Sequence, residues 1–203
     1  MGDQILSEQE LKFQLADILD GVHSMTSKDT ILIEEKLIPG SGFKEFCQYG
    51  LADIRIIVFN LVPVAAMIRI PTPESNGKAN INSGGIGCGI DLQSGKIFST
   101  LSHNKLYKQK FPKESRAYQG KKIPFWDDLL FYSSKIQYFV NMGYLALDWV
   151  ITEDGPKLLE INARAGLEVQ KISDVRLKNV LHKIEDLNIQ DPQKGVEIAQ
   201  TLF

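Results

Sequence analysis

The sequence predicts an α+β fold in which helices flank an antiparallel sheet. Strand-like segments rich in Ile and Val occur as adjacent pairs, at Asp53–Ile70 and Tyr144–Arg164. An amphipathic helical segment, Phe125–Gly143, lies between the two pairs. No linker or repeat divides the 203 residues, so we expect one domain over residues 1–203, with a helical tail over residues 171–203.

Composition indicates an ordinary globular protein, since 43% of the residues are hydrophobic and 24% are charged. The net charge of −2 gives no overall field that favours nucleic acid or an anionic membrane. Basic residues cluster at Lys105–Arg116 and at Lys121 and Lys122, either as a solvated loop or as an anion site. Cys47 and Cys88 form no CxxC motif. Without a secretory signal or a membrane-spanning run, a cytoplasmic protein is expected.

The first half of the chain predicts one helix and three strands. Ser7 and Glu10 have the spacing of a capping box, and apolar residues follow at helical intervals. The segment Thr30–Ile38 alternates in the manner of a strand. Asp53–Ile70 is long enough for two strands, which we expect to meet near Asn60.

The second half predicts a functional loop followed by mixed elements. Arg69–Ile90 is rich in Gly, Asn and Ser, and a loop of that length between strands is more often functional than idle. A tight turn at Gln93–Gly95 follows it. Phe125–Gly143 predicts a helix, and Ser173 is a candidate cap for a second one. A last helix is expected to begin at Asp191.

A hairpin near the end of the chain predicts a metal site. If the turn is Glu153–Pro156, residues whose numbers sum to about 308 face each other. Asp148 and Glu160 then lie side by side, and Asn162 lies one pleat further along the same face. Two carboxylates and an amide oxygen are hard ligands of the kind that Mg²⁺ prefers. The alternative is a strand with one solvated face.

The order of four segments resembles the ATP-grasp enzymes, above all the RimK-type, alpha-L-glutamate-ligase-like group and also the sugar-transfer-associated ATP-grasp proteins. The segments are DIRIIVFN, RIPTPESNGKANINSGG, GYLALDWV and LLEINARAGL. The resemblance implies the C-terminal part of an ATP-grasp fold, lacking the N-terminal lobe and the Gly-rich lysine loop. We therefore expect either a fragment of a longer protein or a reduced form. The GGIGCG run fits no dinucleotide or P-loop fingerprint, so its glycines are expected to allow close backbone approach.

The resemblance implies a role for each matching residue. Asp148, Glu160 and Asn162 would hold two Mg²⁺ ions against the ATP phosphates. The remaining implied roles are adenine recognition by the backbone of Glu35, Lys36 and Leu37, nucleotide binding by Asp53, Lys78 and Asn80, charge neutralisation by Arg55, Arg69 and Arg164, and a turn at Gly166 that faces the acyl substrate.

Structural alternatives remain open for several of these residues. Asp53 and Arg55 are equally the kind of residues that form a cross-strand ion pair. Lys78 lies in a loop where lysines are commonly solvated, and Asn80 is suited to satisfying loop backbone groups. Ala165 stands where the family pattern has Pro, which loosens that turn and leaves the implied ligands intact.

The activity that the resemblance implies is an ATP- and Mg²⁺-dependent carboxylate–amine ligase, with glutamate as one candidate substrate. It would form an amide through an acylphosphate. The expected partners are small-molecule carboxylate and amine substrates, and no nucleic acid is expected. Association with a second copy of the chain or with a separate N-terminal lobe remains open. The alternative is a non-catalytic nucleotide-binding or partner-binding module that needs another lobe or subunit.

Overall fold

The computed structural model describes residues 6–22, 24, 27, 29–102 and 104–202. The chain divides into two compact units, residues 1–37 and residues 38–203. The single domain expected over residues 1–203 therefore stays a prediction. His23, His103 and Phe203 lie outside the described residues.

The first unit contains helix α1, Glu8–Leu19, with the capping box that the sequence predicts. Ser7 Oγ accepts a hydrogen bond from the Glu10 N–H at 3.3 Å, and Glu10 Oε2 accepts one from the Ser7 N–H at 2.8 Å. These bonds satisfy donors that the first turn of a helix leaves unpaired. No residue of α1 is buried, and Phe13 is 70% exposed, so its apolar stripe lacks a covering partner among the described residues.

The prediction of a strand at Thr30–Ile38 is wrong. Residues 29–38 form no β-ladder in the described part of the chain. Leu32 and Ile33 are 79% and 83% exposed. A strand requires a neighbour for its backbone hydrogen bonds, and alternation in the sequence cannot supply one.

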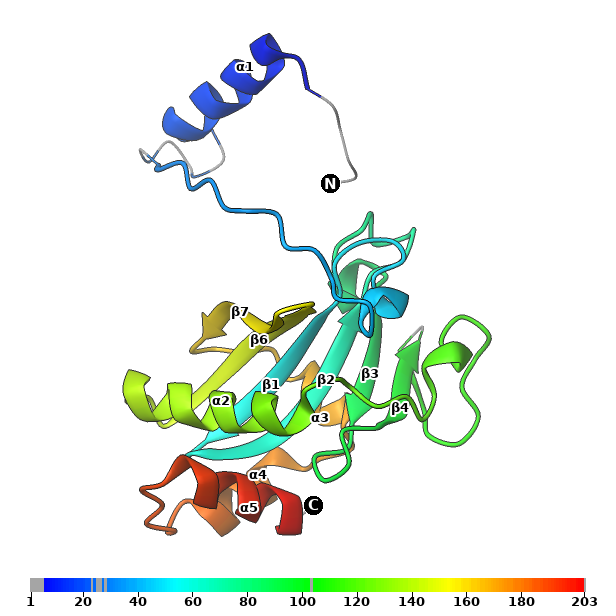
Figure 1. Cartoon of the computed structure of the whole chain (residues 1–203), viewed down its shortest axis with the longest axis vertical. Helices are drawn as coiled ribbons and strands as arrows, with labels where there is room; N and C mark the ends of the chain where they lie inside the picture. Colours follow the sequence, from blue (N-terminus) through cyan, green and yellow to red (C-terminus); the bar gives the residue numbers. More distant parts are fainter. Residues whose placement is uncertain (1–5, 23, 25–26, 28, 103, 203) are drawn as a thin grey trace. The chain divides into compact units, whose positions relative to one another are not determined.

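The second unit is built on a seven-stranded sheet in the order β5-β4-β3-β2-β1-β6-β7, with every neighbouring pair antiparallel (Figure 1). The expected α+β class is confirmed. The two strands expected on either side of Asn60 are also confirmed as β1 and β2. The strands are β1 Asp53–Phe59, β2 Val62–Ile70, β3 Ile86–Ile90, β4 Ile97–Ser102, β5 Lys105–Tyr107, β6 Tyr144–Thr152 and β7 Gly155–Asn162.

Helices cover both faces of the sheet (Figure 1). On one face, Trp149 Nε1 of β6 donates to Ser133 Oγ of α2 at 3.0 Å. On the other, α3, α4 and α5 pack in a core cluster that includes Ile57 and Met67. The α-helices of this unit are α2 Trp126–Val140, α3 Glu168–Ile172, α4 Leu177–Ile184 and α5 Pro192–Leu202, and the 3₁₀ turns are η1 Lys44–Phe46, η2 Ile81–Ser83 and η3 Arg116–Tyr118. Among the described residues, no helix is long and apolar enough to cross a membrane.

Ser173 does not cap a following helix, contrary to the sequence prediction. It is the residue that ends α3, and α4 begins only at Leu177. Its hydroxyl donates to the Ala66 carbonyl of β2 at 2.7 Å. The Ser173 hydroxyl therefore bonds to a distant strand instead of capping the next helix, as local spacing had predicted.

Two glycines of β3 let α3 lie directly on the sheet. A Cβ at Gly89 would lie 2.7 Å from the Ile172 carbonyl oxygen and 2.3 Å from Ser99 Oγ. A Cβ at Gly87 would lie 2.6 Å from Ile172 Cδ1. The expectation of close backbone approach is confirmed at Gly89, whereas the atoms nearest to Gly87 belong to side chains. The position of α3 matters for function. Glu168 is its first residue and Gly166 lies just before it, and both border the cavity described in the next section.

We predict that Gly89→Ala destabilises the protein by about 1–3 kcal/mol, because the added methyl overpacks the contact with the α3 backbone. Urea unfolding of the full chain measures this change. Gly143→Ala is the matched control, since a Cβ there meets nothing within 4 Å, and its effect should stay within about 0.5 kcal/mol. Equal stability of the two variants would contradict the close seating of α3.

Candidate active site

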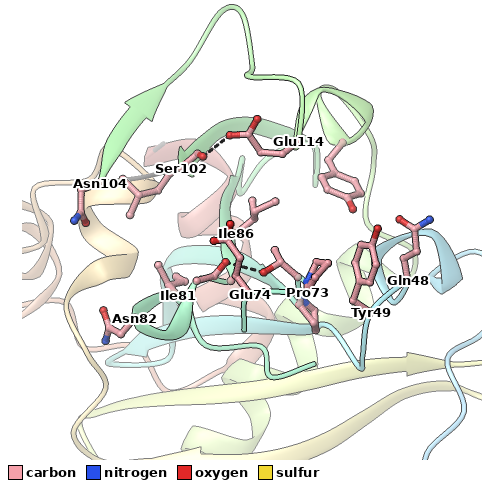
Figure 2. A pocket seen from close by; sticks show the side chains of 16 residues that line it. Gln48, Tyr49, Pro73, Glu74, Ile81, Asn82, Ile86, Ser102, Asn104 and Glu114 are labelled. Carbon is pink, nitrogen blue, oxygen red and sulfur yellow. Dashed lines mark hydrogen bonds between the residues drawn. The ribbon is translucent and has the colours of Figure 1, made fainter. Parts of the chain in front are cut away.

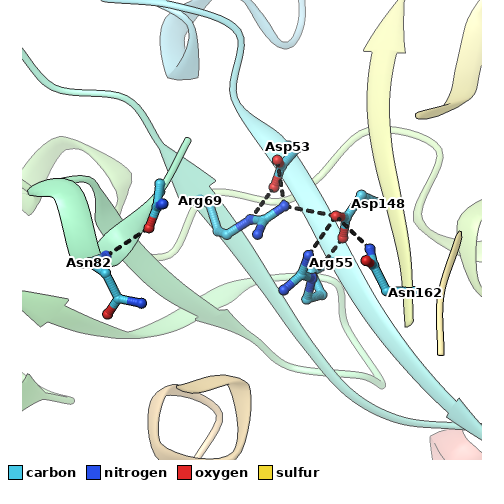
Figure 3. Close-up of polar contacts among 7 residues, drawn as sticks. Asp53, Arg55, Arg69, Asn82, Asp148 and Asn162 are labelled. Atoms are coloured by element: carbon cyan, nitrogen blue, oxygen red, sulfur yellow. Dashed lines mark hydrogen bonds and ion pairs between the residues drawn. The ribbon is translucent and has the colours of Figure 1, made fainter. Parts of the chain in front are cut away.

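Four charged residues from three neighbouring strands gather on one face of the sheet (Figure 3). Asp53 and Arg55 are two residues apart on β1, so their side chains share a face. In the strand register, Arg69 of β2 lies opposite Asp53, and Asp148 of β6 lies opposite Arg55. The sheet therefore places two aspartates and two arginines in one cluster, which we call the Arg–Asp cluster.

Asp148 is the centre of the Arg–Asp cluster. Arg55 donates to it through Nε at 2.7 Å and Nη2 at 2.6 Å, and Arg69 Nη2 donates to its Oδ2 at 2.9 Å. Arg69 also binds Asp53 through Nε at 2.6 Å and Nη2 at 2.7 Å. Asp148 is only 2% exposed. The structure thus pairs Asp53 with Arg69 rather than with Arg55, and each arginine makes a two-point contact with a carboxylate.

Burial dominates the electrostatics of Asp53. Removal from water raises the pKa of its carboxyl from 3.8 to about 6, and the nearby Asp148 charge adds to the rise. The hydrogen bonds and charge of Arg69 act in the opposite direction. For Arg69, burial alone would lower the pKa, but the bonds and charges of Asp53 and Asp148 raise it. The Arg69 guanidinium therefore stays charged in its partly buried position.

The expected metal set lies beside the cluster on β6 and β7. Glu160 pairs with Asp148, as expected, although the pairing depends on a register shift between Asp148 and Trp149. Asn162 Nδ2 donates to Asp148 Oδ2 at 3.3 Å. Glu160 is exposed and makes no hydrogen bond or ion pair with the described residues. Three oxygen-bearing side chains on one face fit a hard cation such as Mg²⁺. Among the described residues no three His, Cys, Asp or Glu side chains form a metal-binding group.

A cavity of about 280 Å³ borders the arginines, and we call it the arginine cavity. It contains four residues that the sequence assigned to the site: Arg55, Arg69, Asn80 and Gly166. Sequence reasoning missed Glu168, which the seating of α3 brings to the same cavity. The complete lining is Arg55, Met67, Arg69, Asn80, Ile81, Asn82, Gly166 and Glu168.

Other predicted site residues lie elsewhere. Lys78 and Arg164 are exposed and border neither the arginine cavity nor a larger cavity of about 680 Å³ in the same unit. Glu35, Lys36 and Leu37 belong to the first unit, in the segment that forms no strand. Adenine recognition was expected from the backbone of a strand in this segment. Because the segment forms no strand, adenine recognition by these residues stays a prediction.

A seven-stranded antiparallel sheet with flanking helices is the architecture of an ATP-grasp domain. Residues 2–186 match the family model described as sugar-transfer associated ATP-grasp, so the chain belongs to that family. A comparison with curated proteins finds no match. Members of the ATP-grasp class are generally ATP-dependent enzymes, and their fold generally binds ATP and Mg²⁺. The RimK-type assignment stays a prediction.

We predict that Asp148→Ala destabilises the free protein by about 3 kcal/mol, because it leaves two partly buried guanidinium groups with less compensating charge. Glu160→Ala is the comparison, and its effect should stay within about 0.5 kcal/mol because the side chain is exposed and unpaired in the described structure. Chemical unfolding of both variants provides the test. Equal losses at the two positions would contradict the central place of Asp148.

We also predict a pH dependence of stability that originates at Asp53. The folded carboxyl holds its proton up to about pH 6, whereas the unfolded one ionises near 3.8. The folded state therefore binds more protons in that window, and the free energy of unfolding falls as pH rises from about 4 to about 6. Asp53→Asn should remove this component in urea unfolding at a series of pH values, and Asp154→Asn in the exposed β6–β7 turn should retain it. An unchanged slope in Asp53→Asn would contradict the raised pKa.

Proposed function

We propose that this chain carries the phosphate- and metal-binding side of an ATP-dependent carboxylate–amine ligase. The strongest support comes from Arg55 and Arg69, which border the arginine cavity. Hydrogen bonds to aspartate carboxylates fix the orientation of both guanidinium groups. Asp53 and Asp148 fix the two guanidinium groups by their Nε and Nη2 atoms. An anion bound in this cavity would meet cationic groups that are already oriented.

The unused donors of the two arginines support an anionic ligand. Among the described residues, no hydrogen bond involves Nη1 of Arg55 or Arg69. The two side chains are only 12% and 16% exposed, so water competes weakly for these donors. Charge-assisted bonds from arginine suit the oxygens of a phosphate or of a carboxylate. Arg164 is exposed on the chain just after β7, and we assign it to the same ligand as an added positive charge.

Asp148, Glu160 and Asn162 are the residues that would hold the metal. When bound, Mg²⁺ would neutralise phosphate charge and orient the transferred phosphoryl group. Asp148 has a double role in this proposal, because the carboxylate that binds a cation in the complex binds Arg55 and Arg69 in the free protein. A nucleotide phosphate would give the arginines an alternative anion and so release oxygens of Asp148. We therefore expect metal and nucleotide to bind together far better than either binds alone.

The proposed reaction has two displacements that need no protein nucleophile. A substrate carboxylate oxygen attacks the γ-phosphorus of ATP, ADP leaves, and an acylphosphate forms. The amine nitrogen then attacks the acyl carbon, inorganic phosphate leaves, and the nitrogen loses a proton to water. Arg55 and Arg69 stabilise the negative charge on the transferring phosphoryl group. Glutamate is one candidate substrate.

We predict that Glu160→Gln weakens binding of Mg·ATP at least about tenfold, because a metal ligand is lost. Calorimetric titration of the full chain with ATP, with Mg²⁺ or with EDTA, measures the effect. The direction is diagnostic, since removing a negative charge that is not a ligand would leave nucleotide affinity unchanged or increase it. Asp154→Asn is the matched control, an exposed carboxylate in the adjoining turn. Tighter or equal binding by Glu160→Gln would contradict the metal assignment.

A binding module is the second candidate function, and the edge strand favours it. Leu158, Leu159 and Ile161 are 38%, 43% and 39% exposed on β7, which is an edge strand of the sheet. Exposed apolar residues on a sheet edge suit a covering lobe or subunit. Hydroxylamine trapping separates the two functions, because only the ligase converts ATP and a carboxylate into an acyl hydroxamate. ATP binding without hydroxamate across a panel of carboxylates would favour the module.

A further inference from the structure

Glu168 is the one acidic side chain among the described residues that line the arginine cavity. It is partly buried, and its carboxylate forms no hydrogen bond or ion pair with any described residue. The same cavity wall carries Arg55 and Arg69, so the cavity offers cationic donors and one unpaired anionic acceptor. An unpaired carboxylate that faces a cavity is available to the positively charged group of a ligand.

The position of Glu168 is fixed by α3, of which it is the first residue. Val169 and Ile172 of this helix are fully buried in the core cluster, and Ser99 Oγ donates to the Ile172 carbonyl. A Cβ at Gly166 would lie 2.3 Å from Glu168 Oε2, so the carboxylate folds back over the Gly166 backbone, at the cavity wall. A group that is positioned before the ligand arrives loses less entropy on binding.

Two ordinary roles for such a carboxylate are already filled by other residues. Each arginine makes a two-point contact with an aspartate of the Arg–Asp cluster, so the cluster contains one carboxylate for each guanidinium group. Glu168 is therefore an additional negative charge. It also joins no group of three His, Cys, Asp or Glu side chains that could hold a metal, as far as the structure describes the chain. The remaining role is to bind a cationic part of the ligand.

A neighbouring cavity provides room for a second substrate. The arginine cavity, of about 280 Å³, is small for two ligands, and a cavity of about 680 Å³ adjoins it (Figure 2). Ile81 and Asn82 line both cavities. In the view of the Arg–Asp cluster, Asn82 lies on the side of Arg69 away from Asp148 (Figure 3). A second substrate in the larger cavity would therefore approach from the side opposite the proposed metal set.

We propose that Glu168 binds the protonated amine substrate and accepts its proton. The inference rests on the proposed ligase function, which places the acylphosphate against Arg55 and Arg69. A primary alkylamine is protonated at neutral pH, so its nitrogen has no electron pair for attack until one proton is removed. The anionic intermediate on the arginines and the cationic amine on Glu168 are complementary, and both are held in one cavity.

The proton balance of the step is complete. One N–H proton of the ammonium group passes to a carboxylate oxygen of Glu168, and the freed electron pair of the nitrogen attacks the acyl carbon. The bond between that carbon and the phosphate oxygen breaks, and inorganic phosphate leaves. The nitrogen loses its second proton to water, and Glu168 returns its own proton to water before the next turnover.

The ratio of two products tests this role. Wild type and Glu168→Gln are supplied with ATP, Mg²⁺ and a carboxylate that yields hydroxamate, and with hydroxylamine, ammonium chloride or methylamine. Hydroxylamine is largely uncharged at neutral pH, so it attacks without a proton acceptor. We expect the ratio of amide to hydroxamate to fall about 100-fold in Glu168→Gln, whereas a loss of structure or of acylphosphate formation would lower both products equally.

The outcomes separate the two proposals. An unchanged product ratio in Glu168→Gln would overturn the role of Glu168 and leave the ligase intact. Hydroxamate from the wild type without amide from ammonium or methylamine would also overturn it. The absence of hydroxamate from the wild type, across the panel of carboxylates, would contradict the ligase function and the inference that rests on it.

The pH dependence of amide formation distinguishes proton acceptance from a structural role. In the wild type the rate should change little between about pH 7 and pH 8, because Glu168 takes the proton from the bound ammonium group. In Glu168→Gln only the unprotonated amine reacts, so the rate should rise about tenfold over that unit of pH. Glu168→Asp keeps a carboxylate and should keep the flat profile. Equal slopes in wild type and Glu168→Gln would rule out the proton acceptor.

Titration with Mg·ATP distinguishes Glu168 from a metal ligand. Glu168→Gln should leave the affinity unchanged or increase it, because it removes a negative charge near the phosphate site, whereas Glu160→Gln should weaken it. Glu197→Gln on α5 is the control, an exposed carboxylate that lines neither cavity, and it should change neither the affinity nor the product ratio. A loss of about tenfold or more in Glu168→Gln would identify a metal or nucleotide ligand instead of a proton acceptor.

Discussion

The shared carboxylate of Asp148 is the constraint on which the site depends. Two guanidinium groups lie partly buried on one face of the sheet, and Asp148 contacts both. Partly buried cations are tolerable only when nearby anions compensate them, so Arg55, Arg69 and Asp148 are fixed as a unit. The same carboxylate is the first member of the proposed metal set. Asp148 therefore compensates the arginine charges in the free protein and, in the proposed complex, would bind the metal.

The antiparallel sheet converts that constraint into a site. Strands β1, β2 and β6 are neighbours, so residues far apart in the chain lie opposite one another and face the same side. The glycines of β3 seat α3 on this side, and α3 brings Glu168 to the arginine cavity.

Sequence reasoning recovered the parts of the site that depend on local pairing. The hairpin placed Asp148 beside Glu160, and the structure has this pair because the register shifts by one residue between Asp148 and Trp149. Sequence reasoning failed where contacts with residues distant in the sequence determine the local structure. The segment Thr30–Ile38 alternates without a neighbouring strand, and Ser173 bonds to β2 rather than to a helix end. Glu168 carried no motif, because only the packing of α3 on the sheet brings it to the arginine cavity.

The most direct test of this account is a crystal structure of the full chain with Mg²⁺ and a non-hydrolysable ATP analogue. The account predicts phosphate oxygens on Arg55 and Arg69, and an ion about 2.0–2.1 Å from oxygens of Asp148 and Glu160. Asp148 should have released at least one of its two arginines. Phosphates bound away from both arginines, or an Asp148 still held by both beside a bound nucleotide, would contradict it.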